Sequence, residues 1–413
     1  MGKNENTPAI RFRGFTDAWE QRKLKDIASS FEYGLNAAAK EFDGENKYLR
    51  ITDIDDATRA FKDDDLTSPD TDLSLSDNYR LQEGDVLFAR TGASVGKSFI
   101  YRESDGLVYF AGFLIRTRIK PEYSAEFIFQ NTLSSQYEKY IQITSQRSGQ
   151  PGVNAHEYGE YSFLMPDYPE QKRIGNFLHR IDNLITLHQR KYDKLVNVKK
   201  SMLEKMFPRD GADVPEIRFA GFTDPWEQRK LSEVADKVTE KNVDLAVQET
   251  FTNSAEYGVI SQRDFFDHDI SNAENIGGYY VVRNEDFVYN PRISVTAPVG
   301  PVNRNKLGRN GVMSPLYTVF RTHDIDTTYL EWFFKSSYWH SFMFFNGDSG
   351  ARSDRFSIKD AIFFEMPIPT PSLAEQRQIG AYMDKLDNLI TLHQRKLEKL
   401  KNIKKSMLEK MFV

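Results

Sequence analysis

The sequence contains no cysteine among its 413 residues, which excludes disulfides and thiolate metal sites. It lacks any apolar run close to the roughly 18 residues that a membrane span requires. Its first ten residues, MGKNENTPAI, also lack the apolar core of a signal peptide. The hydrophobic content of 39% and the aromatic content of 13% are typical of folded globular domains. We therefore expect a cytoplasmic protein without a membrane partner.

An excess of positive charge is also missing, because the net charge is −5. This value argues against a uniformly basic nucleic-acid-binding surface. The charge is unevenly distributed, however, and the segment Glu41–Asp85 holds a dense group of aspartates. By contrast, Glu170–Arg209 has ten Lys/Arg against four Asp/Glu, and Glu375–Val413 has nine against five. We interpret the acidic segment as a solvated surface. Two alternatives stay open: it repels DNA from the wrong face, or it meets a basic partner.

Sequence motifs of catalysis are absent as well. The chain contains no HExxH, GxSxG or GxGxxG motif, and its seven histidines show no metal-ligand spacing. The segment Gly92–Ser98 resembles a phosphate-binding loop, but three residues instead of four separate its glycines. Asn290-Pro291 is followed by Arg292, so the second proline and the aromatic residue of an amino-methyltransferase signature are missing. We expect no active site, no metal and no cofactor bound by this chain.

What the sequence does contain is a duplication. Arg11–Leu24 reads RFRGFTDAWEQRKL, and Arg218–Leu231 differs from it at two positions. DNLITLHQRK begins at Asp182 and recurs 205 residues later, as does KKSMLEKMF, which begins at Lys199. Between these nearly identical ends the two halves diverge strongly. One unit is therefore present twice, with a shared frame and a different insert in each copy.

Each half ends in a segment with a strong heptad pattern, which predicts a long helix or coiled coil. Pairing the two matched segments with each other buries both apolar stripes most simply, and we expect the pair to be antiparallel. The expected pairing positions are Ile174, Ile181, His188, Leu195 and Met202 in the first segment and Ile379, Leu386, His393, Leu400 and Met407 in the second. The neighbouring row is expected to be Phe177, Leu184, Lys191 and Val198, with its counterparts Tyr382, Leu389, Lys396 and Ile403. Leu178, Ile185, Tyr192 and Met206 are expected to widen the apolar stripe of the first segment. We interpret the two histidines as polar residues that set the register of the pair.

Both inserts show the pattern of mixed α/β domains, with short strands broken by Gly, Asn, Asp and Pro. The predicted strands are Asp85–Ala89, Ser98–Tyr101 and Phe113–Ile119 in the first insert and Tyr279–Val282, Asp286–Tyr289 and Tyr317–Arg321 in the second. Each insert also carries one predicted amphipathic helix, around Ala125–Gln142 and Tyr329–Phe345.

Polar loops follow these strands and helices, and they carry the side chains that read base edges or contact phosphates. Any surface loop is rich in the same residues, so this signal alone does not separate DNA binding from ordinary solvation. The candidate DNA-contacting residues are Arg90, Thr91, Ser94, Lys97, Arg147, Gln150, Asn154 and His156 in the first insert and Asn290, Arg292, Ser294, Thr296, Arg352, Ser353 and Arg355 in the second.

The duplicated opening at Pro8–Leu24 and Pro215–Leu231 resembles that of Type I restriction-modification specificity subunits, as do the helices that begin at Glu170 and Glu375 and close in KKSMLEKMF. This resemblance runs from end to end. It implies an α+β protein with two pseudo-symmetric mixed α/β target recognition domains, separated by a pair of long antiparallel coiled-coil helices. The expected division is residues 1–168, first target recognition domain; 169–208, central helix; 209–372, second target recognition domain; and 373–413, C-terminal helix.

The resemblance also implies a function. Each target recognition domain reads one half of a bipartite site in double-stranded DNA, and the helices set the spacer between the halves. The helices also dock two modification subunits, which use S-adenosylmethionine, and two ATP- and Mg-dependent restriction subunits join them. The chain itself is then non-catalytic. Two alternatives stay open: a scaffold that joins proteins without touching DNA, and an autonomous enzyme, for which no cofactor motif is present. A third interpretation, in which the acidic first domain mimics DNA as an inhibitor, is less favoured.

Overall fold

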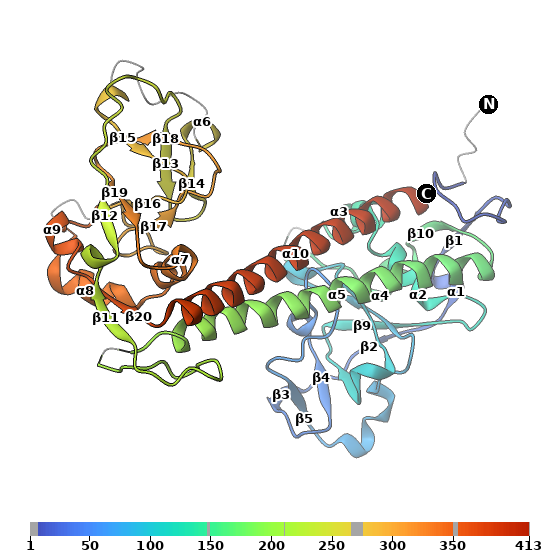
Figure 1. Ribbon diagram of the computed structural model, residues 1–413. Helices are drawn as coiled ribbons and strands as arrows, with labels where there is room; N and C mark the ends of the chain where they lie inside the picture. The colour runs from blue at the N-terminus through green and yellow to red at the C-terminus, as the bar shows by residue number, and fades with distance from the viewer. Residues whose placement is uncertain (1–6, 147–148, 210, 266–275, 350–353, 413) are drawn as a thin grey trace. The chain divides into compact units, whose positions relative to one another are not determined.

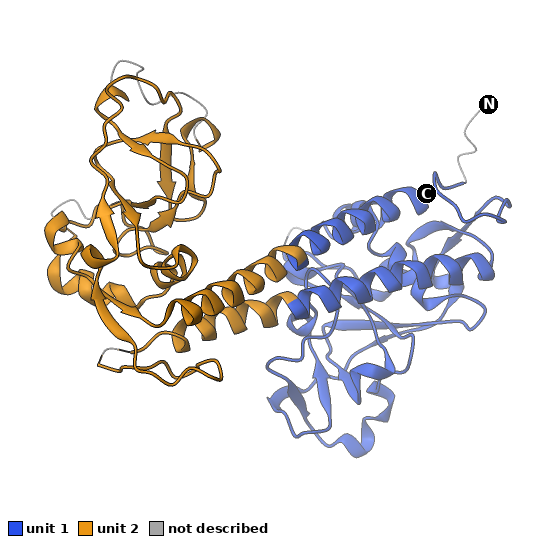
Figure 2. Ribbon diagram, viewed as in Figure 1, with its two compact units in different colours: residues 1–191, 393–413 blue, residues 192–392 orange. Residues whose placement is uncertain are grey.

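The structure is a computed structural model, and it describes residues 7–146, 149–209, 211–265, 276–349 and 354–412. The chain divides into two compact units, coloured separately in Figure 2. Unit 1 comprises residues 1–191 and 393–413, and unit 2 comprises residues 192–392. Each unit therefore contains part of both long helices. No helix among the described residues is long and apolar enough to cross a membrane.

Unit 1 is built on a four-stranded antiparallel sheet in the order β2-β9-β6-β7. The inner strand β6 is completely buried, as its apolar run VLFA predicts. The strands of this sheet are β2 (Ala28–Tyr33), β6 (Val86–Ala89), β7 (Ser98–Ile100) and β9 (Leu114–Ile119). Two-stranded sheets pair β1 (Glu20–Lys23) with β10 (Ser162–Met165), β3 (Ala38–Glu41) with β5 (Thr67–Asp70), and β4 (Lys47–Leu49) with β8 (Val108–Phe110). The short helices are α1 (Leu24–Ile27), α2 (Ala125–Asn131), α3 (Ser135–Thr144) and α4 (Ala155–Gly159).

Unit 2 repeats this plan with a sheet in the order β12-β19-β16-β17. Its strands are β12 (Ala235–Lys237), β16 (Phe287–Tyr289), β17 (Val302–Arg304) and β19 (Thr318–Thr322). Two-stranded sheets pair β11 (Glu227–Lys230) with β20 (Pro367–Thr370), β13 (Phe251–Ser254) with β14 (Gly258–Ser261), and β15 (Tyr280–Val282) with β18 (Gly311–Met313). The short helices are α6 (Gln262–Phe265), α7 (Thr327–Lys335), α8 (Tyr338–Asn346) and α9 (Asp360–Phe363). The predicted mixed helix–strand fold class is therefore confirmed.

The prediction of a single amphipathic helix in each insert was wrong, because each of these segments forms two helices (Figure 1). Between α2 and α3, the Ser134 hydroxyl accepts a hydrogen bond from the Tyr137 backbone N–H and so begins a new helix. Between α7 and α8, Ser336 adopts an extended conformation that ends the first helix. In both cases a serine competes with the helical hydrogen-bond pattern, while the apolar periodicity continues past it.

The two long helices are α5 (Tyr168–Lys205) and α10 (Leu373–Met411). In unit 1 they run antiparallel, because Asp182 forms an ion pair with Lys404 while His188, further along α5, contacts His393. Unit 2 contains the reciprocal ion pair, Lys199 with Asp387. Asp182 and Asp387 are equivalent positions in the two repeats, and so are Lys404 and Lys199. The same contact is therefore made twice.

The rows that face inward on these helices differ in part from the prediction. Ile174, Ile181, Ile379 and Leu386 are buried, and Leu195 and Met202 pack against the core of unit 2. Leu400 and Met407 are half-buried. Leu178 and Ile185, which were expected to widen the stripe, are buried, as is Met383 in α10. Phe177 and Tyr382 are half-buried, and Leu184, which was expected in the neighbouring row, is 44% exposed. In this part of α5 the residues four positions after Ile174 and Ile181 are therefore more deeply buried than those three positions after them.

Candidate nucleic-acid interface

Each unit brings together the two polar loops that the sequence singles out. In unit 1 the loop after β6 meets the loop before α4, where Thr91 forms a β-bridge with Gly152. The Gly92 N–H donates to the Pro151 carbonyl at 3.0 Å, and the Val153 N–H donates to the Arg90 carbonyl at 2.9 Å. These loops lie about 60 residues apart in sequence, so their meeting depends on the fold.

Unit 2 repeats this junction with different side chains. Arg292 forms a β-bridge with Arg355, the Ile293 N–H donates to the Asp354 carbonyl at 3.1 Å, and the Phe356 N–H donates to the Pro291 carbonyl at 2.7 Å. Both arginine side chains are exposed. Three further candidates, Arg147, Arg352 and Ser353, lie outside the described residues.

Glycine sets the shape of the loop after the inner strand in both units. Gly96 and Gly300 have φ values of 84° and 85°, a conformation that disfavours other residues. In unit 1 the buried hydroxyl of Tyr158 donates to the Ala89 carbonyl at 2.6 Å and accepts from the Gly96 N–H at 3.1 Å. This one side chain therefore fixes both ends of the loop that carries the candidate residues 90–94.

Several predicted DNA-contacting residues have structural partners instead. Lys97 is 8% exposed, its Nζ lies 2.5 Å from the Asp56 carboxylate, and it donates to the Ile54 carbonyl. The charge of Lys97 is therefore paired within unit 1, and its contact with DNA stays a prediction. Asn154 caps α4 by accepting from the Glu157 N–H at 2.9 Å. Asn290 accepts from the Arg292 N–H and donates to the Asn253 carbonyl.

The remaining candidates are accessible. Arg90, Thr91 and Ser94 are half-buried, and Gln150 is exposed. The His156 side chain is 83% exposed, and its Nε2 lies 3.9 Å from Glu160. In unit 2, Ser294 and Thr296 are exposed, and their hydroxyls lie 3.2 Å apart.

A cavity lies beside the junction in each unit. In unit 1 it measures about 580 Å³ and is lined by Tyr33, Arg50, Arg90 and Phe113. In unit 2 a cavity of about 630 Å³ is lined by Asn290, Arg292, Leu316 and Arg355, among others. Tyr33, Phe113 and Leu316 were not predicted as interface residues. Phe113 stood in a predicted strand and Tyr33 carried no motif, so only their exposure in the fold marks them.

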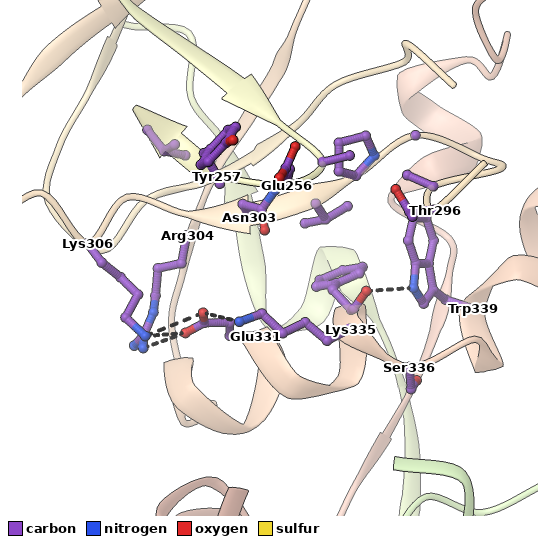
Figure 3. Close-up of a pocket in the computed structure, with 18 of the residues that line it drawn as sticks. Glu256, Tyr257, Thr296, Asn303, Arg304, Lys306, Glu331, Lys335, Ser336 and Trp339 are labelled. Atoms are coloured by element: carbon purple, nitrogen blue, oxygen red, sulfur yellow. Dashed lines mark hydrogen bonds and ion pairs between the residues drawn. The ribbon is translucent and has the colours of Figure 1, made fainter. Parts of the chain in front are cut away.

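Unit 2 has a second cavity, of about 650 Å³, with Thr296 in its wall (Figure 3). Arg304, Lys306 and Lys335 converge on the buried Glu331 carboxylate at 2.6, 3.3 and 3.1 Å. Burial acts to raise the pKa of Glu331, but these three cations outweigh it and lower the pKa. The carboxylate therefore stays ionised, and Lys306, with half of its side chain exposed, can also meet a phosphate at the mouth of the cavity.

No group of three or more possible metal ligands occurs among the residues that the structure describes. The interface is thus made of hydrogen-bonding and cationic side chains on two loop junctions. Such side chains can bind an anionic, groove-bearing ligand through its edges and its phosphates.

Comparison with known proteins gives two matches to one family model, the Type I restriction modification DNA specificity domain, at residues 16–197 and 223–402. A protein of Methanocaldococcus jannaschii assigned as the type I restriction enzyme MjaX specificity subunit is 24% identical, over 98% of this chain and 95% of its own. The MjaVIII specificity subunit of the same organism is 21% identical, over 79% of this chain and 78% of its own. The crystal structure of the Type I restriction-modification system S subunit from M. genitalium shares the fold, with a TM-score of 0.57 at 12% identity and coverage of 98% and 99%.

Proposed function

The chain belongs to the family of Type I restriction-modification DNA specificity domains, with one copy of the domain in each half, and from this membership we propose that it is the DNA-recognition subunit of a Type I restriction-modification enzyme. Each unit reads one half of a bipartite site in double-stranded DNA. One observation carries this proposal: the same loop junction is built twice on the same frame, and its side chains differ between the copies. A protein that only joined others would have no need of two divergent sets.

The reading residues of unit 1 are Arg90, Thr91, Ser94, Gln150 and His156, and those of unit 2 are Arg292, Ser294, Thr296 and Arg355. In unit 1 the first four of these residues lie in the segments that meet at the Thr91–Gly152 bridge, and His156 lies in α4, which follows them. In unit 2 the residues lie on the loops that meet at the Arg292–Arg355 bridge. Arginine side chains recognise guanine, and hydroxyl and amide side chains complete the pattern of donors and acceptors. The acidic segment 41–85 of unit 1 keeps that unit from binding DNA through charge alone. The division into residues 1–168, 169–208, 209–372 and 373–413 remains our prediction for the functional segments.

The helices dock the partner subunits on their outer face. Leu184 and Leu187 are 44% and 46% exposed, and Leu392, the repeat of Leu187, is 45% exposed. An apolar residue that is exposed at the same position of both helices, Leu187 and Leu392, suits two copies of one partner. These are the two modification subunits, which supply S-adenosylmethionine and methylate adenine. Two restriction subunits supply the ATP- and Mg-dependent steps, and the whole enzyme works in the cytoplasm.

The test is single-molecule methylation sequencing of DNA from cells that express this chain with its partner methyltransferase, compared with cells that lack the chain. We expect a bipartite motif with N6-methyladenine on both strands, present only with this chain. No new methylation beside a demonstrably active partner would contradict the proposal and favour a scaffold that joins proteins without reading DNA.

A further inference from the structure

Two exposed aromatic rings flank Arg90 in unit 1. Tyr33 ends β2 and is 44% exposed, and Phe113 lies in the turn before β9 and is 60% exposed. The guanidinium carbon of Arg90 lies 5.2 Å from the centre of the Tyr33 ring and 5.7 Å from that of the Phe113 ring. Both distances lie within the range of a cation–π contact. Rings this exposed on a domain surface suggest a binding site.

The backbone holds these three residues in place. The Arg90 N–H donates to the Phe113 carbonyl at 3.1 Å, and the Val153 N–H donates to the Arg90 carbonyl at 2.9 Å. The Tyr33 hydroxyl accepts from the Ala155 N–H at 3.3 Å, which ties its ring to the loop before α4. Arg90 also directly follows β6, whose four residues are all buried. The arginine therefore projects from a rigid point, between two rings that are each tied to the junction.

The charge of Arg90 lacks a partner within the described part of the chain. Other arginines of unit 1 do have carboxylate partners: Arg50, Arg102 and Arg118 lie 2.8, 2.7 and 3.3 Å from the carboxylates of Asp53, Glu126 and Asp85. Among the described residues no carboxylate pairs with Arg90, and its buried Nε donates to no acceptor. A fixed guanidinium without a carboxylate partner indicates an acceptor that comes from outside.

We propose that Tyr33 and Phe113 form a clamp that fixes Arg90 as a guanine-reading residue, so that both aromatic positions determine specificity at one base of the unit 1 half-site. This inference rests on the proposed function. The two cation–π contacts hold the guanidinium without using its N–H groups, which can then donate to the two acceptors of guanine, O6 and N7. A phosphate would need no such fixed plane, because its oxygens accept from many directions.

Unit 2 lacks this clamp and so supplies a matched control. The hydrogen bond from Phe356 to Pro291 corresponds to that from Val153 to Arg90, so a proline occupies the position of the arginine. Leu316 stands two residues before Thr318, which pairs with the inner strand as Ile115 does in unit 1. It thus corresponds to Phe113, and it is 59% exposed.

The experiment measures methylation rates of the assembled complex on duplexes in which each base of the bipartite motif is varied in turn. Arg90→Lys should lower discrimination for guanine at one position of the unit 1 half-site by about ten- to a hundredfold. Tyr33→Ala and Phe113→Ala should lower it at the same position by roughly three- to tenfold, since each removes one cation–π contact. Leu316→Ala should leave that position unchanged.

Replacing the guanine by 7-deazaguanine provides an independent readout. It removes the N7 acceptor, so the methylation rate of the wild-type complex should fall. The rate of the Arg90→Ala complex, which already lacks the donor, should fall little further. If the rate losses caused by Arg90→Ala and by 7-deazaguanine were additive, the inference would be overturned. So would a unit 1 half-site without guanine, or an Arg90→Ala complex that keeps its motif and only has a lower salt dependence, as expected of a phosphate contact. A wild-type complex that methylates no bipartite site would instead contradict the proposed function. Melting temperatures of the variants control for folding.

Discussion

The two units have the same frame and different side chains at their loop junctions. In unit 1 Arg11 binds the buried Glu170, and in unit 2 Arg218 binds the buried Glu375, each through two hydrogen bonds of 2.7–2.8 Å. Gln171 and Gln376 make the same pair of backbone contacts, each accepting from the N–H of a residue before the first helix of the insert and donating to a proline carbonyl. These contacts join the opening segment and the insert to the long helices.

At the loop junctions, by contrast, only the backbone is repeated. Thr91 and Gly152 in unit 1 correspond to Arg292 and Arg355 in unit 2. The side chains that join the opening segment to the long helices are thus identical in both copies, whereas those at the loop junctions differ. Under the proposed function, this difference separates stability from specificity. The predictions below test that separation.

Loss of the buried ion pair should have the largest effect, and it should be equal in both units. Glu170→Gln leaves the Arg11 charge without its buried carboxylate partner, and Glu375→Gln does the same to Arg218. Each should lower the free energy of unfolding by about 3 kcal/mol, measured by urea denaturation of the full chain. The exposed pair Glu20–Arg22 is the control, and Glu20→Gln should cost less than about 0.5 kcal/mol. A clear loss from only one of the two buried variants would break the equivalence of the frames.

Loss of an outward arginine should affect only one half-site. Arg292→Ala removes an exposed side chain at the unit 2 junction, so we expect discrimination at one base to fall by about 1–3 kcal/mol. The unit 1 half-site should be read as before. Methylation rates on duplexes altered in one half-site at a time measure both effects. Val295→Ala, in the same loop and fully exposed, is the control. Equal weakening of both half-sites would show that Arg292 contributes general affinity instead.

The sequence alone predicts most of the frame, because local pattern determines it. The run VLFA predicts a buried strand, and the heptads predict α5 and α10. The duplication predicts that both halves fold alike, and the family resemblance is confirmed by the matched domains. The strand and helix signals lie within single short segments, where periodicity is informative.

The partners of the candidate site could not be predicted in this way. The sequence places Lys97 in a polar loop and so suggests an exposed cation, but its carboxylate partner, Asp56, comes from a distant segment. Likewise, nothing near Arg90 in sequence indicates that Tyr33 and Phe113 flank it. Composition and spacing identify which loops face outward, but contacts between distant segments decide which of their side chains remain available.

In the histidine pair, His188 and His393, a repeated residue meets its own copy. The Nδ1 atoms of His188 and His393 lie 2.8 Å apart, so one ring must donate and the other accept. Burial, and then the other histidine with Lys396 and Lys191, lowers the pKa of His188, and burial with the same two lysines lowers that of His393.

Because both pKa values lie below the unfolded value of about 6.5, the unfolded chain binds more protons in acid. The histidines' contribution to stability is therefore present above pH 6.5 and lost as the pH falls through the folded pKa values. We expect the melting temperature to drop by a few degrees more between pH 7.5 and 5.5 in the wild type than in the double variant His188→Asn, His393→Asn. An equal drop in both proteins would show that the pair does not sense pH.

The smallest predicted effect separates two equivalent glycines. A Cβ at Gly175 would lie 2.9 Å from the Phe127 backbone nitrogen, so the backbone of α2 would have to move. A Cβ at Gly380 would lie 3.0 Å from the Thr328 methyl and 3.3 Å from the nearest backbone atom, the Tyr329 nitrogen. Alanine favours a helix over glycine by about 1 kcal/mol. At Gly380 this gain and the mild crowding nearly cancel, while at Gly175 displacement of the backbone outweighs it.

We therefore expect Gly380→Ala to leave the urea midpoint almost unchanged and Gly175→Ala to lower stability by about 1 kcal/mol. Unchanged slopes of the urea transitions would show that the native fold is kept. Equal effects at the two sites would mean that α2 and α7 yield equally to the long helices, and that the small difference between the frames has no energetic consequence. The expected inequality would instead place the tighter helix contact in unit 1, next to the ion pair that both units share.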